Sequence, residues 1–289
     1  MIKEIEARVL LNYVKQPDLW FGLRYNMNLY RGCQHQCIYC DSRSECYQIE
    51  DFTDVLVKVN AIDLLKVELA RKPVKGTIGT GSMNDPYMPI ERKLNLTGRA
   101  LQTIAQFKFP VHIITKSDLV LKDLETLREI NQVYAAVSFT ITTADDELAK
   151  KLEPGAPPPS LRFKAMQVLA ENGILTGVTL MPVLPYIEDN EENITQVVTQ
   201  AYESGASFII PSMGMSLRDR QRAYYYDKLD RLFPGIRVKY EQKYGNQYHV
   251  RASNAERLDF VFRDLCGRFG IATRIIPYKT QTAEQLPLF

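Results

Sequence analysis

The chain has 289 residues, of which 45% are hydrophobic, so it can bury a large core as one α/β barrel or as two smaller domains. Its formal net charge is +2. No apolar run approaches the length that a bilayer-spanning segment needs, and the N-terminal segment carries Lys3, Glu4, Glu6 and Arg8 where a signal peptide would be apolar. We therefore expect a cytoplasmic protein with no membrane partner.

The charge is unevenly distributed along the chain. From Gly214 to the last residue there are 14 Lys or Arg against 8 Asp or Glu, whereas the preceding residues are net acidic. Such an asymmetry favours a polyanionic partner for the C-terminal part. A solvated helix surface would account for the same charges equally well.

Short β-rich segments alternate with segments of helical periodicity after an N-terminal arm over residues 1–24. In chain order, the predicted strands are Tyr25–Tyr30, Lys75–Gly79, Val111–Lys116, Tyr134–Thr140, Leu175–Met181 and Ser207–Pro211. The predicted helices between them are Val55–Arg71, Leu96–Phe107, Leu121–Ile130, Ser160–Asn172 and Glu191–Ser204. Right-handed crossovers between parallel strands place helices outside the sheet, so the pattern predicts an α/β fold, a partial (βα)6 TIM-type barrel over residues 25–213.

The pattern changes beyond Gly214. Helices are predicted near Arg218–Leu232 and Asn254–Phe269, on either side of a tyrosine-rich segment. We expect residues 214–281 to form a helical C-terminal extension that covers the mouth of the barrel, and residues 282–289 to form a tail. Function in such sheets collects at the carboxyl ends of the strands, which is where the remaining motifs fall.

Three of the five cysteines follow the first predicted strand, as Cys33, Cys37 and Cys40 in C-x3-C-x2-C spacing. Thiolates are the soft ligands of iron–sulfur clusters, and three of them leave one iron of a [4Fe–4S] cluster open. An open iron can chelate the amino and carboxylate groups of S-adenosylmethionine, whose reductive cleavage gives a 5′-deoxyadenosyl radical. A zinc site usually has a second cysteine pair downstream, and this sequence has none.

Other side chains near the motif have more than one interpretation. Cys266 stands alone on a predicted helix, which is typical of a small buried hydrophobic residue. Cys46 is a fourth ligand, a hydrogen donor or an inert thiol. His35 is a metal ligand or a hydrogen-bonding residue beside the cluster.

The cysteine loop resembles the signature of the radical S-adenosylmethionine superfamily, with Tyr39 at the position of an aromatic residue close to the adenine. Within that superfamily the chain is most similar to the spore photoproduct lyase group of DNA-repair-photolyase-like proteins, over about Met27–Met213. The loop from Gly32 to Ser44 carries the group's extended motif. The resemblance implies a radical enzyme of lyase type that binds a [4Fe–4S] cluster, S-adenosylmethionine and an external one-electron reductant.

The same resemblance assigns cofactor contacts to residues that follow the predicted strands. It implies that Ser82, Asn84 and Asp85 receive the methionine amino group, although the same segment reads equally as a Gly/Pro turn. Lys116 would hold the cofactor carboxylate, which suits an ammonium group at a barrel mouth, while a lone lysine is also commonly solvated. The resemblance also implies a ribose hydrogen bond from Ser138, a carboxylate partner for Arg162 and an apolar wall at the adenine from Pro182. Alternatively, Ser138 is a serine of the barrel interior and Arg162 is an arginine on a helix surface.

One departure from the family bears on the substrate. In spore photoproduct lyase a cysteine just after strand two returns a hydrogen atom to the repaired base, whereas Thr77–Tyr87 contains no cysteine here. Ser82 and Met83 stand nearest that position, and neither donates hydrogen atoms well. Repair of that thymine lesion therefore requires another donor, for which Cys46, Tyr87 and Tyr39 are the candidates.

Two features of the C-terminal part suggest partners. Tyrosines at 224–226, 240, 244 and 248 are interleaved with Lys and Arg, a pattern that stacks bases and binds phosphates or, alternatively, packs against the barrel. The tail resembles the motif with which bacterial replication and repair proteins dock into the sliding clamp, through Gln285, Leu286, Leu288 and Phe289. A tail folded onto its own barrel, or a disordered tail, is the alternative.

These observations rank three functions. The first is a radical enzyme that abstracts hydrogen from a damaged or modified nucleic-acid base, with DNA as the partner that the family resemblance implies. The second keeps the radical chemistry but acts on a peptide or a small metabolite. The third is a non-catalytic iron–sulfur module that binds nucleic acid or senses redox state.

Overall fold

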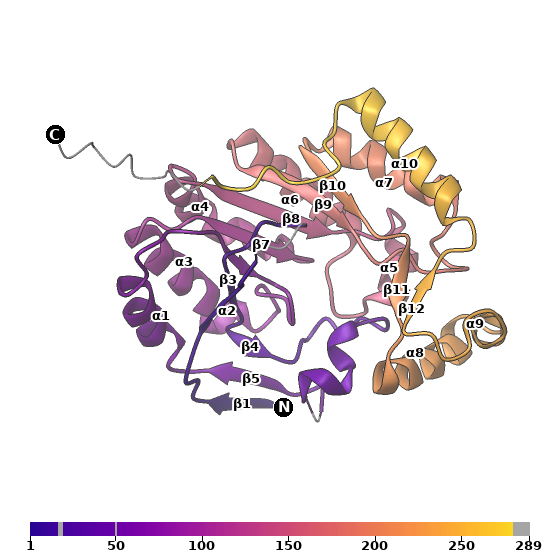
Figure 1. The fold of residues 1–289 in the computed structure, drawn as a ribbon, viewed down its shortest axis with the longest axis horizontal. Helices are drawn as coiled ribbons and strands as arrows, with labels where there is room; N and C mark the ends of the chain where they lie inside the picture. Colours follow the sequence, from indigo (N-terminus) through magenta and orange to yellow (C-terminus); the bar gives the residue numbers. More distant parts are fainter. Residues whose placement is uncertain (17–19, 50, 280–289) are drawn as a thin grey trace.

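A computed structural model describes residues 1–16, 20–49 and 51–279. Across these residues a seven-stranded sheet has the order β10-β9-β8-β7-β6-β3-β2 (Figure 1). Its parallel strands are β3 (Tyr25–Met27), β6 (Ile78–Thr80), β7 (Val111–Thr115), β8 (Ala135–Thr140), β9 (Leu175–Leu180) and β10 (Phe208–Pro211), and β2 (Leu11–Tyr13) pairs antiparallel with β3. The predicted α/β fold with six parallel strands is confirmed.

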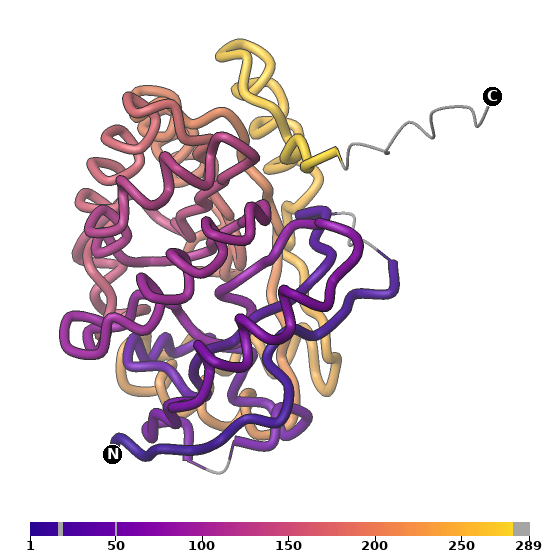
Figure 2. The backbone as a smooth tube through the Cα atoms, turned by 90° about the vertical axis from the view of Figure 1, so that its left-hand side faces the viewer, coloured from indigo at the N-terminus to yellow at the C-terminus, as the bar shows by residue number. Residues whose placement is uncertain are grey.

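Helices connect the parallel strands and cover the outer face of the sheet (Figures 1 and 2). They are α1 (Ala61–Ala70), α3 (Leu96–Gln106), α4 (Leu124–Ile130), α6 (Pro159–Glu171) and α7 (Glu191–Glu203), with the short helices α2 (Glu91–Leu94) and α5 (Asp146–Leu152) beside them. Every residue of β8 is buried, as expected for a parallel strand covered on both faces. Glycines end two of these helices, at Gly173 with φ 74° and Gly205 with φ 78°.

Two of the predicted elements near the N-terminus were wrong. The first residues of the predicted helix Val55–Arg71 form β5 (Val55–Lys58), whose residues are alternately buried and half-buried, and α1 begins only at Ala61. The predicted strand Tyr25–Tyr30 is split, because β4 (Tyr30–Arg31) leaves the main sheet and pairs with β5. With β1 (Ile2–Ile5), these strands form a separate three-stranded sheet in the order β1-β5-β4.

The C-terminal part contains both predicted helices, as α8 (Asp219–Leu232) and α10 (Ala255–Phe269), together with α9 (Ile236–Tyr244), which had not been predicted. Strands β11 (Gly214–Ser216) and β12 (His249–Arg251) form a two-stranded antiparallel sheet, and α8 and α9 lie between these two strands in the sequence. In Figure 1, α10 lies along α7, while α8 lies beside the two 3-10 turns, η1 (Asp41–Arg43) and η2 (Glu45–Tyr47), that follow the cysteine motif.

Three hydrophobic clusters occupy the interior of the described part of the chain, the smallest of them formed around Phe208 and Ile275. The largest one fills the space between the sheet and its outer helices. A second cluster joins the cysteine loop to the C-terminal part, with Ile38 and Tyr39 packed near Leu184, Tyr225 and Tyr240.

Two predictions made from the sequence concern membrane segments and the C-terminal tail. In the part that the structure describes, no helix combines the length and the hydropathy needed to span a bilayer. The predicted sliding-clamp anchors, Gln285, Leu286, Leu288 and Phe289, lie outside the described residues.

Candidate active site

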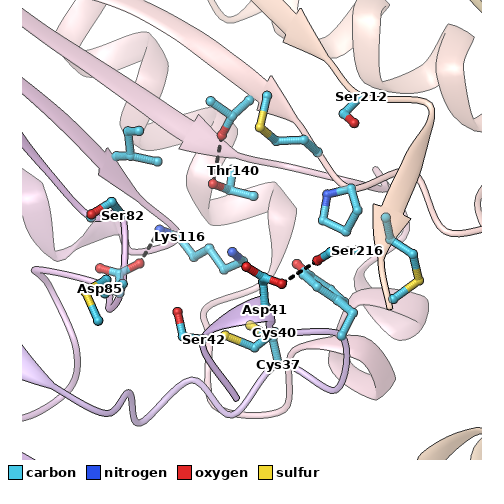
Figure 3. Close-up of a pocket in the computed structure, with 18 of the residues that line it drawn as sticks. Cys37, Cys40, Asp41, Ser42, Ser82, Asp85, Lys116, Thr140, Ser212 and Ser216 are labelled. Atoms are coloured by element: carbon cyan, nitrogen blue, oxygen red, sulfur yellow. Dashed lines mark hydrogen bonds between the residues drawn. The ribbon is translucent and has the colours of Figure 1, made fainter. Parts of the chain in front are cut away.

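A cavity of about 740 Å³ lies at the carboxyl ends of the parallel strands. Side chains from successive strand ends line it: Asp85 after β6, Lys116 after β7, Thr140 at the end of β8 and Pro182 after β9 (Figure 3). The cysteine loop forms another part of the lining, and residues around β11 and β12 a further part. The cavity therefore collects residues from most of the chain at one end of the sheet, where catalytic sites form in such folds.

The cysteine loop has a conformation that its own sequence supports. Gly32 has φ 78°, and a Cβ atom there would lie 1.9 Å from the carbonyl oxygen of Asp54, so a side chain is excluded. Ile38 N donates a hydrogen bond to Leu152 O at 2.8 Å, and Gln36 Nε2 donates to Cys33 O at 2.5 Å. These contacts hold the three thiols at the cavity.

Burial controls the chemistry of these thiols. It raises the pKa of Cys33 to about 12, and it also raises the pKa values of Cys37 and Cys40. Thiols in such surroundings ionise when a metal replaces their protons. Among the described residues, no three His, Cys, Asp or Glu side chains are grouped to hold one metal ion, but a cluster in which each thiolate binds its own iron does not need that grouping. Three soft donors facing one cavity, two of them buried and Cys40 partly exposed, thus fit a three-cysteine cluster site.

Asp85 fastens the cysteine loop to the end of β7. The buried ring of His35 places Nε2 3.2 Å from Asp85 Oδ2 and Nδ1 2.9 Å from Gly155 O. Asp85 also accepts hydrogen bonds from Thr115 Oγ1 at 2.7 Å and from Lys116 N at 2.6 Å. Burial alone would raise the pKa of Asp85, but the interactions with His35 and these hydrogen bonds outweigh it and bring that pKa to about 2.

A second buried carboxylate positions two cavity residues. Glu153 forms an ion pair with Arg162 Nη2 at 2.5 Å, lies 3.9 Å from Lys116 Nζ, and accepts a hydrogen bond from the Tyr39 hydroxyl. Although burial favours its neutral form, the charges of Arg162 and Lys116 lower the pKa of Glu153. Arg162 is anchored in turn by Thr140 O at 2.8 Å. Lys116 is therefore a fixed cation on the cavity wall.

The structure brings most of the predicted site residues together. The lining contains Cys33, Cys37, Tyr39, Cys40, Ser82, Asn84, Asp85, Lys116 and Pro182. Two others are not among the described lining residues. Ser138 is fully buried 2.7 Å from His112 Nε2, and Arg162 lies behind the wall, paired with Glu153.

The three candidate hydrogen donors occupy different surroundings. Tyr39 lines the cavity, with its hydroxyl bonded to Glu153. Tyr87 is fully buried and donates to Asp123 Oδ2 at 2.9 Å, and Cys46 is exposed 3.7 Å from Arg218 Nη1; neither is among the described lining residues. The position next to Ser82 and Met83 carries no thiol, as the sequence indicates.

Sequence reasoning missed part of the lining. Trp20, Phe21 and Leu23 of the N-terminal arm reach the cavity, as do His249 and Arg251 of β12. Methionines at positions 83, 181, 213 and 215 also line the cavity, and none of them was assigned a contact from the sequence. The methionines at 83, 181 and 213 follow β6, β9 and β10, so the strand-end rule could have found them, whereas the approach of the arm and of β12 has no local signal.

The tyrosines of the C-terminal part mostly pack inside the protein. Tyr225 and Tyr240 are fully buried, with their hydroxyl oxygens 3.1 Å apart, and Tyr226 and Tyr244 are also buried. Tyr248, by contrast, is 61% exposed. The four buried tyrosines therefore agree with the alternative interpretation, in which they pack against the barrel. Their rings are not accessible for stacking with bases.

Comparisons with known proteins agree with this architecture. The family model of the radical SAM superfamily matches residues 27–198. An uncharacterized protein of Mycobacterium tuberculosis (strain ATCC 25618 / H37Rv) is 30% identical over 290 residues, which cover 97% of this chain and 85% of that protein. An uncharacterized protein of Methanocaldococcus jannaschii is 35% identical over 193 residues, covering 66% of this chain and 70% of that protein.

Among solved structures, spore photoproduct lyase complexed with dinucleoside spore photoproduct superposes with a TM-score of 0.68 at 16% sequence identity. The match covers 93% of this chain and 79% of that chain, and it shows a common fold. The matched family region contains the cysteine loop and the strand ends that form most of the cavity. The chain therefore belongs to the radical SAM superfamily, whose enzymes use a [4Fe–4S] cluster and S-adenosylmethionine.

Proposed function

We propose that this radical SAM enzyme abstracts a hydrogen atom from a nucleic-acid base, in a lyase-type reaction similar to that of spore photoproduct lyase. The observation that carries the proposal is the cavity itself, in which three cysteine thiols and Lys116 lie in one space with the basic side chains of Arg218, His249 and Arg251. When bound, the cluster and S-adenosylmethionine supply a 5′-deoxyadenosyl radical. The rest of the reaction depends on how the chain binds and orients its ligands.

In this proposal Cys33, Cys37 and Cys40 hold the cluster, and the strand ends hold the cofactor. Lys116, fixed by Glu153, attracts the carboxylate of the methionine part, and Asp85, which stays ionised above a pH of about 2, attracts its ammonium group. Tyr39 and Pro182 supply ring surface to the adenine. Ser138 and Arg162 act through other residues, since Ser138 contacts His112 and Arg162 orients Glu153.

The nucleic acid would approach between the N-terminal arm and β12. Arg218, His249 and Arg251 provide positive or hydrogen-bonding groups for phosphates, and Trp20 and Phe21 provide aromatic surface for a base. Residues 214–281 would then cover the mouth of the barrel as an extension. Peptides and small metabolites remain the alternative substrates.

The hydrogen donor is a further part of the proposal. Of the three candidates, Tyr39 is the one that lies in the described cavity lining, so we assign to its hydroxyl the return of a hydrogen atom to the substrate radical; the tyrosyl radical left behind takes one electron from the external reductant and one proton. Tyr39→Phe would then cleave S-adenosylmethionine but yield less reduced product. Normal product yield from that variant would remove Tyr39 from the reaction.

The decisive experiment is anaerobic. The protein is reconstituted with iron and sulfide, reduced, and given S-adenosylmethionine, and 5′-deoxyadenosine is quantified without DNA, with intact DNA and with ultraviolet-damaged DNA. Stimulation by damaged DNA supports the proposal. Stimulation by peptides or metabolites alone identifies the second function, and DNA binding without 5′-deoxyadenosine identifies the third.

Variants connect the result to the cavity. Arg251→Ala should weaken DNA binding and lower its salt dependence by about one unit of slope, because one phosphate contact is lost. Arg268→Ala is the matched control, since this exposed arginine on α10 pairs with Asp264 and is absent from the described lining. Equal effects of the two substitutions would contradict a specific role for β12.

The sliding clamp remains a proposed partner of the tail. Deletion of residues 282–289 should abolish clamp binding without changing the cleavage of S-adenosylmethionine. Clamp affinity that survives the deletion would exclude docking through Gln285, Leu286, Leu288 and Phe289.

A further inference from the structure

A buried arginine accompanies the cysteine motif. Arg43 is 8% exposed and ends the turn η1, which begins directly after Cys40. Its backbone N donates to Cys40 O at 3.3 Å, and its Nη2 donates to Gln36 Oε1 at 2.6 Å. Because Gln36 Nε2 in turn donates to Cys33 O, Arg43 is tied to both ends of the motif.

Two aromatic rings enclose the guanidinium group. Its Cζ atom lies 4.4 Å from the ring centre of Phe52 and 3.6 Å from the ring centre of Tyr224. Tyr224 belongs to α8, and Arg220 of the same helix donates from Nε to Arg43 O at 3.2 Å. Such stacking suits a planar guanidinium and leaves its N–H groups free to bond only within its plane.

Among the described residues, no carboxylate forms an ion pair with Arg43. Burial lowers the pKa of Arg43, and negative charge on the nearby Cys40, Cys37 and Cys33 would oppose that shift. Its Nε is buried and has no hydrogen-bond acceptor among the described residues. A buried cation with a free donor is costly unless a negative group faces it, and the cysteine site is where that negative charge would arise.

We propose that Arg43 is the counter-charge of the iron–sulfur cluster and raises its reduction potential. An external one-electron reductant gives the cluster one electron, no bond forms or breaks, and the negative charge at the site grows by one unit. A fixed cation stabilises the reduced state more than the oxidised state, and cluster potentials respond to charge and hydrogen bonds around the sulfur atoms. The inference rests on cysteine ligation of the cluster and is independent of the substrate.

The proposal also gives the C-terminal extension a role in redox chemistry. Tyr224 stacks on the guanidinium and Arg220 donates to the backbone carbonyl of Arg43, both from a segment about 180 residues away in the sequence, so α8 fixes the position of the charge. Arg43 is a positioning residue in this sense, because it acts on the cluster and not on the substrate.

The test compares Arg43→Met with Arg43→Lys. Each protein is reconstituted anaerobically, its iron and sulfide content is measured, and its midpoint potential is determined by a redox titration followed by electron paramagnetic resonance, without S-adenosylmethionine or substrate. Arg43→Met should shift the midpoint potential to a more negative value, whereas Arg43→Lys, which keeps the charge, should stay close to the unsubstituted protein. A fully loaded Arg43→Met protein with an unchanged potential would overturn the proposal.

Loss of the cluster is also informative. If Arg43→Met folds, as judged by its circular dichroism and melting temperature, but loads little iron while Arg43→Lys loads fully, the charge is needed to hold the cluster and the proposal stands. Equal loss in both variants would show a purely structural role and overturn it. Tyr224→Phe keeps the stacked ring and is the matched control, with an unchanged potential expected.

Discussion

The barrel and the contact between the cysteine loop and α8 are held together by different forces. Strands β7, β8 and β9 are almost entirely buried and contribute alternate apolar side chains to the large hydrophobic cluster, so apolar burial stabilises them. The contact with α8 and with the preceding strand β11 adds directional bonds to a smaller apolar cluster: Gln221 Nε2 donates to Tyr39 O at 3.0 Å, Ser216 Oγ donates to Asp41 Oδ1 at 2.6 Å, and Arg43 stacks on Tyr224. Apolar burial stabilises the barrel but does not depend on one precise geometry. Hydrogen bonds and ring stacking do depend on geometry, so they hold the cysteine loop in one position.

The largest effect is expected at the cysteine motif. Cys37→Ala removes a thiolate, so the protein should lose its cluster and all cleavage of S-adenosylmethionine. Iron and sulfide analysis and 5′-deoxyadenosine assays measure both losses. Cys46→Ser is the matched control and should retain the cluster, because Cys46 is exposed and is absent from the described lining. Full activity of the Cys37→Ala protein would refute the site.

A substitution in the barrel should change stability more than any single hydrogen bond of the α8 contact. Ile113→Ala, at a fully buried position of β7, should lower the free energy of unfolding by about 3 kcal/mol because it leaves a cavity. Urea unfolding of the cluster-free protein measures this change. Ile113→Val should cost about 1 kcal/mol, and equal costs for the two substitutions would contradict tight packing at this position.

Glu188 makes stability depend on pH. Burial raises the pKa of this carboxyl from 4.5 to about 8, so the folded protein keeps a proton that the unfolded chain has lost. Stability should therefore fall as the pH rises from about 5 to 8, by up to about 1.4 kcal/mol per pH unit, and level off above the folded pKa. Below a pH of about 4.5, Glu188 is protonated in both the folded and the unfolded protein, so its ionisation no longer changes the stability with pH.

Glu188→Gln isolates this contribution, since the amide cannot ionise in the titrated range. Unfolding free energies of both cluster-free proteins at pH 5, 6, 7 and 8 should diverge with increasing pH, with Glu188→Gln losing less stability. Parallel curves would mean that another group carries the pH dependence.

The smallest effect is expected for the hydrogen bond between β11 and the turn that follows the cysteine motif. Ser216→Ala removes the bond to Asp41 at a half-buried position and should cost about 1 kcal/mol or less. Ser216→Thr retains the hydroxyl and should stay close to the unsubstituted protein in urea unfolding. A cost for Ser216→Ala as large as that of Ile113→Ala would remove the distinction between the two regions.

Much of the fold follows from local patterns. The alternation of strands with amphipathic helices predicts the six parallel strands, because the periodicity of each element reflects which of its faces is buried. Where the pattern is short, it misleads: β5 was assigned to a helix because its four residues run directly into α1. No local property distinguishes such a strand, since its pairing with β1 and β4 is decided elsewhere in the chain.

The site divides in the same way. The spacing of Cys33, Cys37 and Cys40 is local, so the sequence by itself determined the thiolate motif, and the family resemblance of the segments after the strands pointed to Asp85 and Lys116, which line the cavity. Only the tertiary structure decided that Arg162 supports Glu153 from behind the wall, and that Tyr224 meets Arg43. Contacts between residues so far apart depend on how whole elements pack, and a linear pattern of residue types carries no record of that packing.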